Sequence, residues 1–258
     1  MISLKKRVKE FQLIQKIGKK IIKDPCFIRT KEITLKELSK SPNRTTIINF
    51  LLELTSSENY LEIGVRNPND NFSHIKCTTK FSVDPGLEFK ENPVDFKLTS
   101  DEFFEKLEGN KLQQFKKDIK FDVIFIDGLH TSGQVEKDIQ NSLKYIKDSG
   151  FIILHDCNPP TEFHQRENYL FRNSPAGGFW NGTTWKAFYK YRHSKGLYSV
   201  CFDTDWGVGV ISKSEYPQFN RIQDSIANEY FEYSLLDENR KEYLNLQLFE
   251  EWKINLKK

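Results

Sequence analysis

Two short segments of the sequence combine carboxylates with imidazoles. Asp127 and His130 lie in the sequence DGLH, and His155 and Asp156 are neighbours. Each segment follows a nearly continuous apolar run, FDVIFI or GFIIL, of the kind found in buried strands of a parallel sheet. Because the carboxyl ends of neighbouring parallel strands meet at one edge of the sheet, we expect these side chains to converge there. Such a cluster could bind a divalent metal, or supply a general base with a partner that orients it.

A second set of polar residues belongs to two earlier apolar runs. The run YLEIGVR contains Glu62, Gly64 and Arg66, and FSVDPG places Asp84 after the next run. A glycine lets the backbone approach a ligand closely, and an acid after the second strand can accept hydrogen bonds from both hydroxyls of a ribose. Glu62 interrupts an apolar strand, so its carboxylate needs a cationic ligand group or backbone donors nearby. The loop GVRNPND lacks the G-x-G-x-x-G spacing, which disfavours pyrophosphate binding.

The elements that must position these residues alternate along the chain. From residue 59, the short apolar runs YLEIGV, KFSVDPG, VDFKLTS, FDVIFIDG and GFIILHD alternate with helical patterns, which indicates βαβ units. The later runs YSVCFDT and WGVGVIS predict a closing hairpin. We predict an α/β fold with a doubly wound, mostly parallel sheet. It has a C-terminal β-hairpin and a helical extension at each end, divided as 1–57, 58–213 and 214–258.

Three local signals predict where helices begin and end. Ser41 and Pro42 have the types preferred at the N-cap and the first helical position. Thr131 and Gln134 have capping-box spacing at the start of a helix. Gly150 is then the expected stop signal of that helix.

The composition is that of a globular protein. The chain has 258 residues, of which 38% are hydrophobic, and no run of about 18 apolar residues is present. Its four cysteines form no CxxC pair, so neither a disulfide framework nor a zinc knuckle is indicated. We expect a cytoplasmic protein without a transmembrane segment.

The net charge of +3 hides a strongly basic first segment. Residues 1–23 hold eight Lys or Arg and one acid, Glu10, and apolar residues recur there every three or four positions. This pattern predicts an amphipathic helix with a basic face. Such a helix could contact anionic lipid, nucleic acid or a partner subunit. We favour a helix packed on its own domain with its lysines in solvent, because charge runs on helices usually face water.

Four motifs resemble those of the class I S-adenosylmethionine-dependent methyltransferases. They are YLEIGVR, FSVDPG, LTSDEFF and FDVIFIDGLHT, and the resemblance spans roughly residues 58–213. The stretch FIDGLHTSGQVEKDIQNSLKYIKDSGFIILHDCNPP is similar to a bacterial branch that includes sugar O-methyltransferases of macrolide and aminocoumarin biosynthesis. The resemblance implies S-adenosylmethionine as the cofactor and a hydroxyl of a small polar molecule, such as a sugar or glycoside, as the acceptor.

The resemblance also implies roles for individual residues. His130 would deprotonate the acceptor hydroxyl, assisted by Asp127, and a divalent metal such as magnesium or manganese would bind Asp127, His155 and Asp156. Magnesium prefers oxygen ligands, so the histidine at 155 either favours a metal that tolerates nitrogen or abolishes the site. The implied cofactor-binding residues are Glu62, Gly64, Arg66, Asp84, Ser100, Asp101 and Asp127.

Other interpretations stay open at this stage. The segment PAGGFWNGTTWKAF, residues 175–188, contains Trp180 and Trp185, which either form a lid over the acceptor or pack into the core. The cluster of histidines and aspartates would also suit a metal-dependent oxygenase. A non-catalytic binding module that docks through the basic N-terminal helix is a further alternative. We expect no nucleic-acid partner for the methyltransferase, and a homo-oligomer is an open option.

Overall fold

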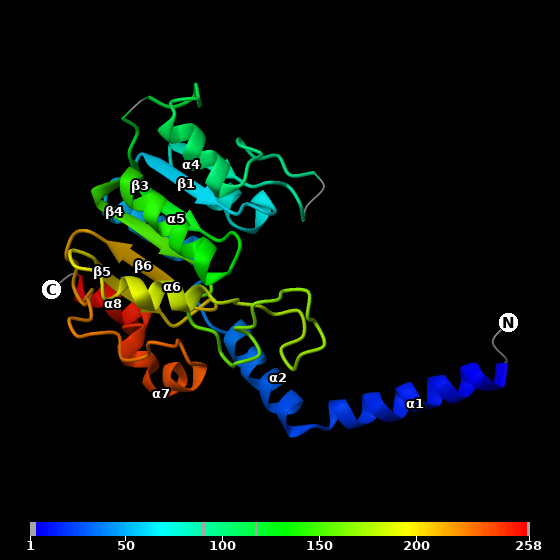
Figure 1. Ribbon diagram of the computed structural model, residues 1–258. Coiled ribbons are helices and arrows are strands. Elements are labelled where there is room, and N and C mark those ends of the chain that lie inside the picture. Colours follow the sequence, from blue (N-terminus) through cyan, green and yellow to red (C-terminus); the bar gives the residue numbers. More distant parts are fainter. Residues whose placement is uncertain (1–3, 89–90, 117, 257–258) are drawn as a thin grey trace.

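The computed structural model describes residues 4–88, 91–116 and 118–256, which build one seven-stranded sheet between two layers of helices (Figure 1). The strand order is β2-β1-β3-β4-β6-β5-β7. Pairing is parallel from β2 to β4, while β6 runs antiparallel to both β4 and β5. The strands are β1 (Asn59–Ile63), β2 (Thr79–Val83), β3 (Phe121–Ile126), β4 (Ile146–Leu154), β5 (Tyr198–Phe202), β6 (Val208–Ser212) and β7 (Leu246–Gln247).

Helices cover both faces of the sheet, as expected for a doubly wound fold. In β3, Ile124 packs with the helices of one face and Phe125 with those of the other, because successive strand residues point to opposite sides. The first layer contains α4 (Ser100–Glu108), α5 (Ser132–Tyr145), α6 (Thr184–Tyr191) and α7 (Tyr233–Tyr243). The second contains α3 (Arg44–Leu54) and α8 (Phe249–Asn255). The predicted fold class and the closing hairpin of β5 and β6 are confirmed.

The chain reverses direction across the sheet next to β1. It passes from β1 to β2 on one side and then crosses to β3 on the other side of β1. Ligands of open α/β sheets bind in the crevice outside the carboxyl ends of the strands at such a switch point. The fold therefore places the candidate site after β1 and β3.

The local signals for helix ends were less accurate. Helix α3 begins at Arg44, because the side chain of Asn43 accepts a hydrogen bond from the Thr46 amide and acts as the N-cap. Thr131 is the N-cap residue of α5 but makes no side-chain capping bond. Gly150 lies inside β4, where a Cβ atom would come within 2.6 Å of the Asp122 carbonyl oxygen. That glycine therefore permits close approach of strands instead of ending a helix.

Two further segments differ from the predicted pattern. VDFKLTS forms no strand; Phe96 makes a single bridge to Val83, and the next helix begins at Ser100. The C-terminal segment has the helices α7 and α8 but also adds β7, which pairs with β5. Residues 213–232 contain turns and no helix. The division at residues 57 and 213 stays a prediction.

The N-terminal helices α1 (Leu4–Ile22) and α2 (Pro25–Leu38) form an arm, and α1 extends away from the sheet (Figure 1). Apolar residues of α1 such as Phe11 and Ile14 are 61% and 66% exposed. The expectation that this helix packs on its own domain was therefore wrong. Among the described helices, none is long and apolar enough to cross a membrane.

Candidate active site

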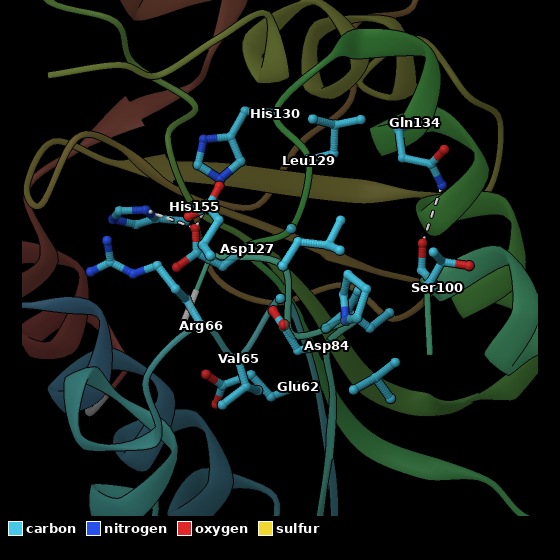
Figure 2. A pocket seen from close by; sticks show the side chains of 18 of the residues that line it. Glu62, Val65, Arg66, Asp84, Ser100, Asp127, Leu129, His130, Gln134 and His155 are labelled. Carbon is cyan, nitrogen blue, oxygen red and sulfur yellow. Dashed lines mark hydrogen bonds and ion pairs between the residues drawn. The ribbon is translucent and has the colours of Figure 1, made fainter. Parts of the chain in front are cut away.

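A cavity of about 630 Å³ opens at the carboxyl ends of β1, β2, β3 and β4 (Figure 2). The site residues predicted from the sequence lie between Glu62 and Asp156, in five separate segments of the chain. Every site residue predicted from the sequence lines this one cavity: Glu62, Gly64, Arg66, Asp84, Ser100, Asp101, Asp127, His130, His155 and Asp156.

Glu62 is a buried carboxylate, with 3% of its surface exposed. Its Oε2 atom accepts hydrogen bonds from the Tyr60 hydroxyl at 2.6 Å and from the Asn71 amide at 2.9 Å. Burial raises the pKa of Glu62 to about 7, and the nearby charge of Asp127 adds to the rise. A cationic group entering the cavity would therefore stabilise the ionised form of Glu62.

Gly64 is required by the packing of two chain segments at the switch point. Its φ angle is +92°, and an added Cβ atom would lie 2.3 Å from the Asp127 carbonyl oxygen and 2.5 Å from Cα of Gly128. The glycine thus lets the loops after β1 and β3 touch. This contact brings Asp127 against the end of β1, where Glu62 lies.

Asp84 follows β2 and is held by local hydrogen bonds. Its Oδ1 atom accepts from the Gly86 amide at 2.6 Å and from the Asn92 side chain at 2.8 Å. Arg66, in the loop after β1, is ion-paired with Asp70 at 3.0 Å, and 63% of its side chain is exposed. Asp84 is therefore fixed in the wall of the cavity, whereas Arg66 lies near its solvent-exposed rim.

Ser100 and Asp101 form the first turn of α4, which begins with a capping box between Thr99 and Glu102. The side-chain amide of Gln134 on α5 donates to Ser100 Oγ at 3.1 Å and to Asp101 Oδ1 at 2.9 Å. The hydrogen bond from Gln134 lowers the pKa of Asp101. Gln134, which the sequence suggested only as a capping residue, thus joins the two helices beside the cavity.

The second predicted cluster is formed by the ends of β3 and β4. Asp127 Oδ1 lies 3.2 Å from His130 Nε2 and 3.2 Å from His155 Nδ1. Asp156 Oδ2 lies 3.1 Å from His155 Nδ1 and 3.1 Å from His130 Nδ1. The predicted convergence of two carboxylates and two imidazoles is therefore present.

Two residues of this cluster were not predicted. Arg44, at the start of α3, places Nε 3.8 Å from Asp127 Oδ2, and its backbone amide donates to Asp205 Oδ2 at 2.7 Å. Asp205, in the turn between β5 and β6, also places Oδ1 3.4 Å from His155 Nε2. The predicted hairpin could have indicated Asp205. Because β6 runs antiparallel to β4, the turn before β6 lies at the end of β4.

Charges in this cluster stabilise one another. Burial opposes the charging of His155, but the carboxylates of Asp156 and Asp127 outweigh it and raise its pKa well above the usual value. Burial likewise opposes the ionisation of Asp127, but His155 and His130 hold the pKa of Asp127 well below its usual range. Asp205 is also buried, yet its hydrogen bond to His155 lowers its pKa to about 2. The cluster thus pairs carboxylates with protein cations.

The atoms that could hold a metal ion belong to a set different from the predicted one. Donor atoms of Asp127, His130 and Asp156 lie within 4.8 Å of one another. His130 Nδ1 is buried and makes no hydrogen bond within the described residues, although Asp156 Oδ2 lies 3.1 Å from it, so the two atoms could bind the same ion. Both nitrogens of His155 instead face carboxylates. The metal site that uses His155 stays a prediction.

A loop between β4 and α6 covers one side of the cavity. The ring of Trp180 stacks on His130 with 5.1 Å between centroids, and Tyr169 lines the same wall. Trp185, in contrast, is fully buried in the core. Trp185 therefore packs into the core, and a lid that contains Trp180 stays a prediction.

The two ends of this loop are joined to each other. The amides of Asn181 and Gly182 both donate to the His164 carbonyl oxygen, at 2.9 and 3.2 Å. The Thr183 amide donates to the His130 carbonyl oxygen at 2.7 Å. Residues 165–180 therefore leave and return at one point, next to His130.

Comparison with known proteins agrees with this geometry. Residues 68–157 match the family model described as a methyltransferase domain. No curated protein matches the sequence. The chain thus contains a methyltransferase domain, and its sheet order and its cavity at the switch point agree with the class I S-adenosylmethionine-dependent type that the sequence motifs predict. The expectation of a methyltransferase is confirmed.

Several solved methyltransferase structures are similar in outline. An O-methyltransferase from Bacillus cereus, solved with SAH, is 13% identical; the match covers 73% of this chain and 90% of that one, with a TM-score of 0.43. The SAH-bound methyltransferase PaMTH1 from Podospora anserina is 12% identical, with 79% and 96% covered and a TM-score of 0.41. TomG from Streptomyces achromogenes, an O-methyltransferase of tomaymycin synthesis solved with SAM, is 10% identical, with 74% and 90% covered and a TM-score of 0.43.

Proposed function

We propose that this protein transfers the methyl group of S-adenosylmethionine to a hydroxyl of a small polar acceptor such as a sugar, with His130 as the general base. The observation that carries the proposal is the arrangement of one cavity. Its walls hold the predicted cofactor residues after β1 and β2 and the Asp127–His130 pair after β3. The matched methyltransferase domain favours this function over an oxygenase or a non-catalytic binding module.

In the proposed complex, three acidic residues receive the cofactor. The ionised carboxylate of Glu62 pairs with the ammonium of the methionine moiety, and Asp84 accepts hydrogen bonds from the ribose hydroxyls. Ser100 and Asp101 lie beside the adenine. Arg66, in the loop after β1 at the cavity rim, contacts the carboxylate of the methionine moiety. When bound, the cofactor supplies an activated methyl group on a sulfonium.

The role of His130 follows from its two ring nitrogens. Asp127 accepts a hydrogen bond from Nε2, which leaves the lone pair of the neutral ring on Nδ1. Nδ1, which lies 3.1 Å from Asp156 Oδ2, is then the atom that takes up the acceptor proton, and the Asp156 carboxylate stabilises the imidazolium that results. Stacking on Trp180 fixes the plane of the ring and excludes water from one of its faces. Removal of the proton leaves an alkoxide aligned for attack on the methyl carbon.

A metal at Asp127, His130 and Asp156 would instead polarise the acceptor hydroxyl as a Lewis acid. We favour the base role, because Arg44 and His155 already place positive charge among the three carboxylates. The two roles are separable by experiment. If His130 is a base, turnover persists after treatment with a chelator; if it is a metal ligand, turnover is lost and manganese restores it.

A sugar suits the side of the cavity that lies beyond His130. This wall has an aromatic surface, from Tyr169 and Trp180. Aromatic faces pack against the apolar face of a sugar ring. A cytoplasmic location and a homo-oligomeric state stay predictions.

Calorimetric titration with S-adenosylmethionine and its demethylated product tests the cofactor part. We expect saturable binding that Asp84→Asn weakens and Asp148→Asn leaves unchanged. Asp148 is 94% exposed and lies near the amino-terminal end of β4, whereas the cavity lies at the carboxyl end. The acceptor part is tested with a panel of glycosides and mass detection of the added methyl group. His130→Ala should then abolish transfer but keep cofactor affinity. Absence of cofactor binding would refute the proposal.

A further inference from the structure

Helix α1 carries an apolar stripe that the described residues do not cover. Its side chains recur at three- and four-residue steps and are 42–66% exposed: Val8, Phe11, Ile14, Ile17 and Ile21. Four lysines lie on the opposite side of the helix: Lys9, Lys16, Lys19 and Lys20. The arm therefore presents an apolar face and a basic face to solvent together.

A helix of this kind needs a surface to lie on. Isolated helices gain most of their stability in proteins from packing of an apolar face. Here that packing is missing along most of α1, since every residue from Lys6 to Ile21 is exposed except Gly18, which is partly buried. The occupant must cover the stripe and also tolerate the basic residues.

Charge selects between the possible occupants. Residues 1–23 contain eight basic residues and one acid, so pairing α1 with α1 of a second copy would bring like charges together with only Glu10 of each copy to compensate them. An anionic bilayer surface satisfies both faces of the helix. The apolar stripe enters the boundary between headgroups and acyl chains, and the lysines reach the phosphates.

We infer that α1 docks the protein on membranes that contain anionic phospholipid, lying in the plane of the interface. The arm is suitably placed for this. Figure 1 shows α1 reaching out on the side of the sheet toward which β1 points, which is also the side of the cavity. Docking through α1 would therefore leave the cavity near the membrane surface. This inference does not depend on the proposed methyl transfer.

Cosedimentation of the full chain with lipid vesicles tests the inference. Vesicles of equal parts phosphatidylglycerol and phosphatidylcholine are compared with vesicles of phosphatidylcholine alone. We expect binding to the anionic vesicles only, and its loss when salt is raised from about 0.1 M to about 1 M, where the Debye length falls from about 10 to about 3 Å.

Two matched variants locate the contact. Ile14 and Ile254 are isoleucines on helices, 66% and 60% exposed, so an aspartate at either position meets water in the free protein. Ile14→Asp should weaken vesicle binding by about tenfold or more, because it places a charge in the inserted stripe. Ile254→Asp should leave binding unchanged. Circular dichroism and cofactor titration confirm that both variants are folded.

Several outcomes would overturn the inference. They are no binding to anionic vesicles, equal loss of binding in both variants, and binding that ignores salt. Sedimentation velocity without lipid covers the protein occupant: self-association that Ile14→Asp abolishes would assign the stripe to a second copy. Tight binding of a short RNA in place of vesicles would assign the basic face to nucleic acid.

Discussion

Nε2 of His155 lies 3.4 Å from Oδ1 of Asp205, so a carboxylate from the β5–β6 turn supports an imidazole at the end of β4. The other ring nitrogen of His155 faces Asp127 and Asp156. The resemblance seen in the sequence implied that His155 binds a metal. The structure surrounds that histidine with carboxylates, so that its own positive charge lies among them.

Asp205→Asn should destabilise the protein by about 3 kcal/mol at about pH 7, because it removes one of the carboxylates that compensate the charges of His155 and Arg44. The pKa of Asp205 is lowered to about 2, below the unfolded value of about 3.9. Its contribution is therefore present above about pH 4 and is lost as the pH falls toward 2. Urea unfolding of wild type and variant at about pH 7 and about pH 3 checks this. The prediction would be contradicted if the two proteins differed in free energy of unfolding by the same amount at both pH values. An equal effect of Asp148→Asn would also contradict it.

Cofactor affinity should depend on the ionisation of Glu62. Its pKa of about 7 in the free protein means that much of it is protonated in mild acid. If the ammonium of the cofactor pairs with the carboxylate, affinity should rise by about tenfold between about pH 6 and pH 8. Glu62→Gln should bind more weakly and without this pH dependence. Calorimetry across the range provides the measurement, and an unchanged slope in the variant would argue against the pairing.

The two glycines Gly64 and Gly133 should respond oppositely to alanine. Gly64→Ala should cost at least about 2 kcal/mol of stability, because the new methyl group meets the Asp127 backbone at a positive φ angle. Gly133 lies in the first turn of α5 with no atom within 4 Å of an added Cβ. Gly133→Ala should therefore gain about 0.5–1 kcal/mol. Thermal unfolding of both variants tests the contrast.

The buried carboxyl group of Asp138 should lower the free energy of unfolding of the protein in neutral solution. Burial raises its pKa to about 6, so the folded protein retains a proton that the unfolded chain releases above about pH 4. The sign is thus a loss of stability as the pH rises from about 4 to about 6. Asp138→Asn keeps an oxygen for the Gln134 amide and removes the charge. The variant should gain stability over wild type by roughly 2 kcal/mol at about pH 8 and by much less at about pH 4. Parallel denaturation curves at both pH values would show it.

Residues that end buried strands could be placed from the sequence alone. Asp127 and His155 follow apolar runs that each form one strand, so the parallel sheet brings them together. Arg44 could not be found in this way, because it reaches the cluster through the docking of a helix that precedes the sheet. Periodicity predicts that α3 is a helix, but not where it lies. The segment VDFKLTS was misjudged because its backbone pairs with β2 at Phe96 alone, beside the hydrogen bonds that the Asp95 side chain accepts from Ser82, so no strand extends along it.

The hydrogen bonds that join His164 to Gly182 make the loop between them independent of the backbone that carries His130. Because residues 165–180 start and finish at one hydrogen-bonded point, their length and sequence can change without moving the backbone of His130. Exchange of this segment would replace the aromatic wall formed by Tyr169 and Trp180 while His130, the proposed base, keeps its backbone position. Residues 165–180 can therefore be exchanged as a unit. Acceptor preference can then be re-engineered, or can diverge among descendants, while the proposed reaction centre stays unchanged.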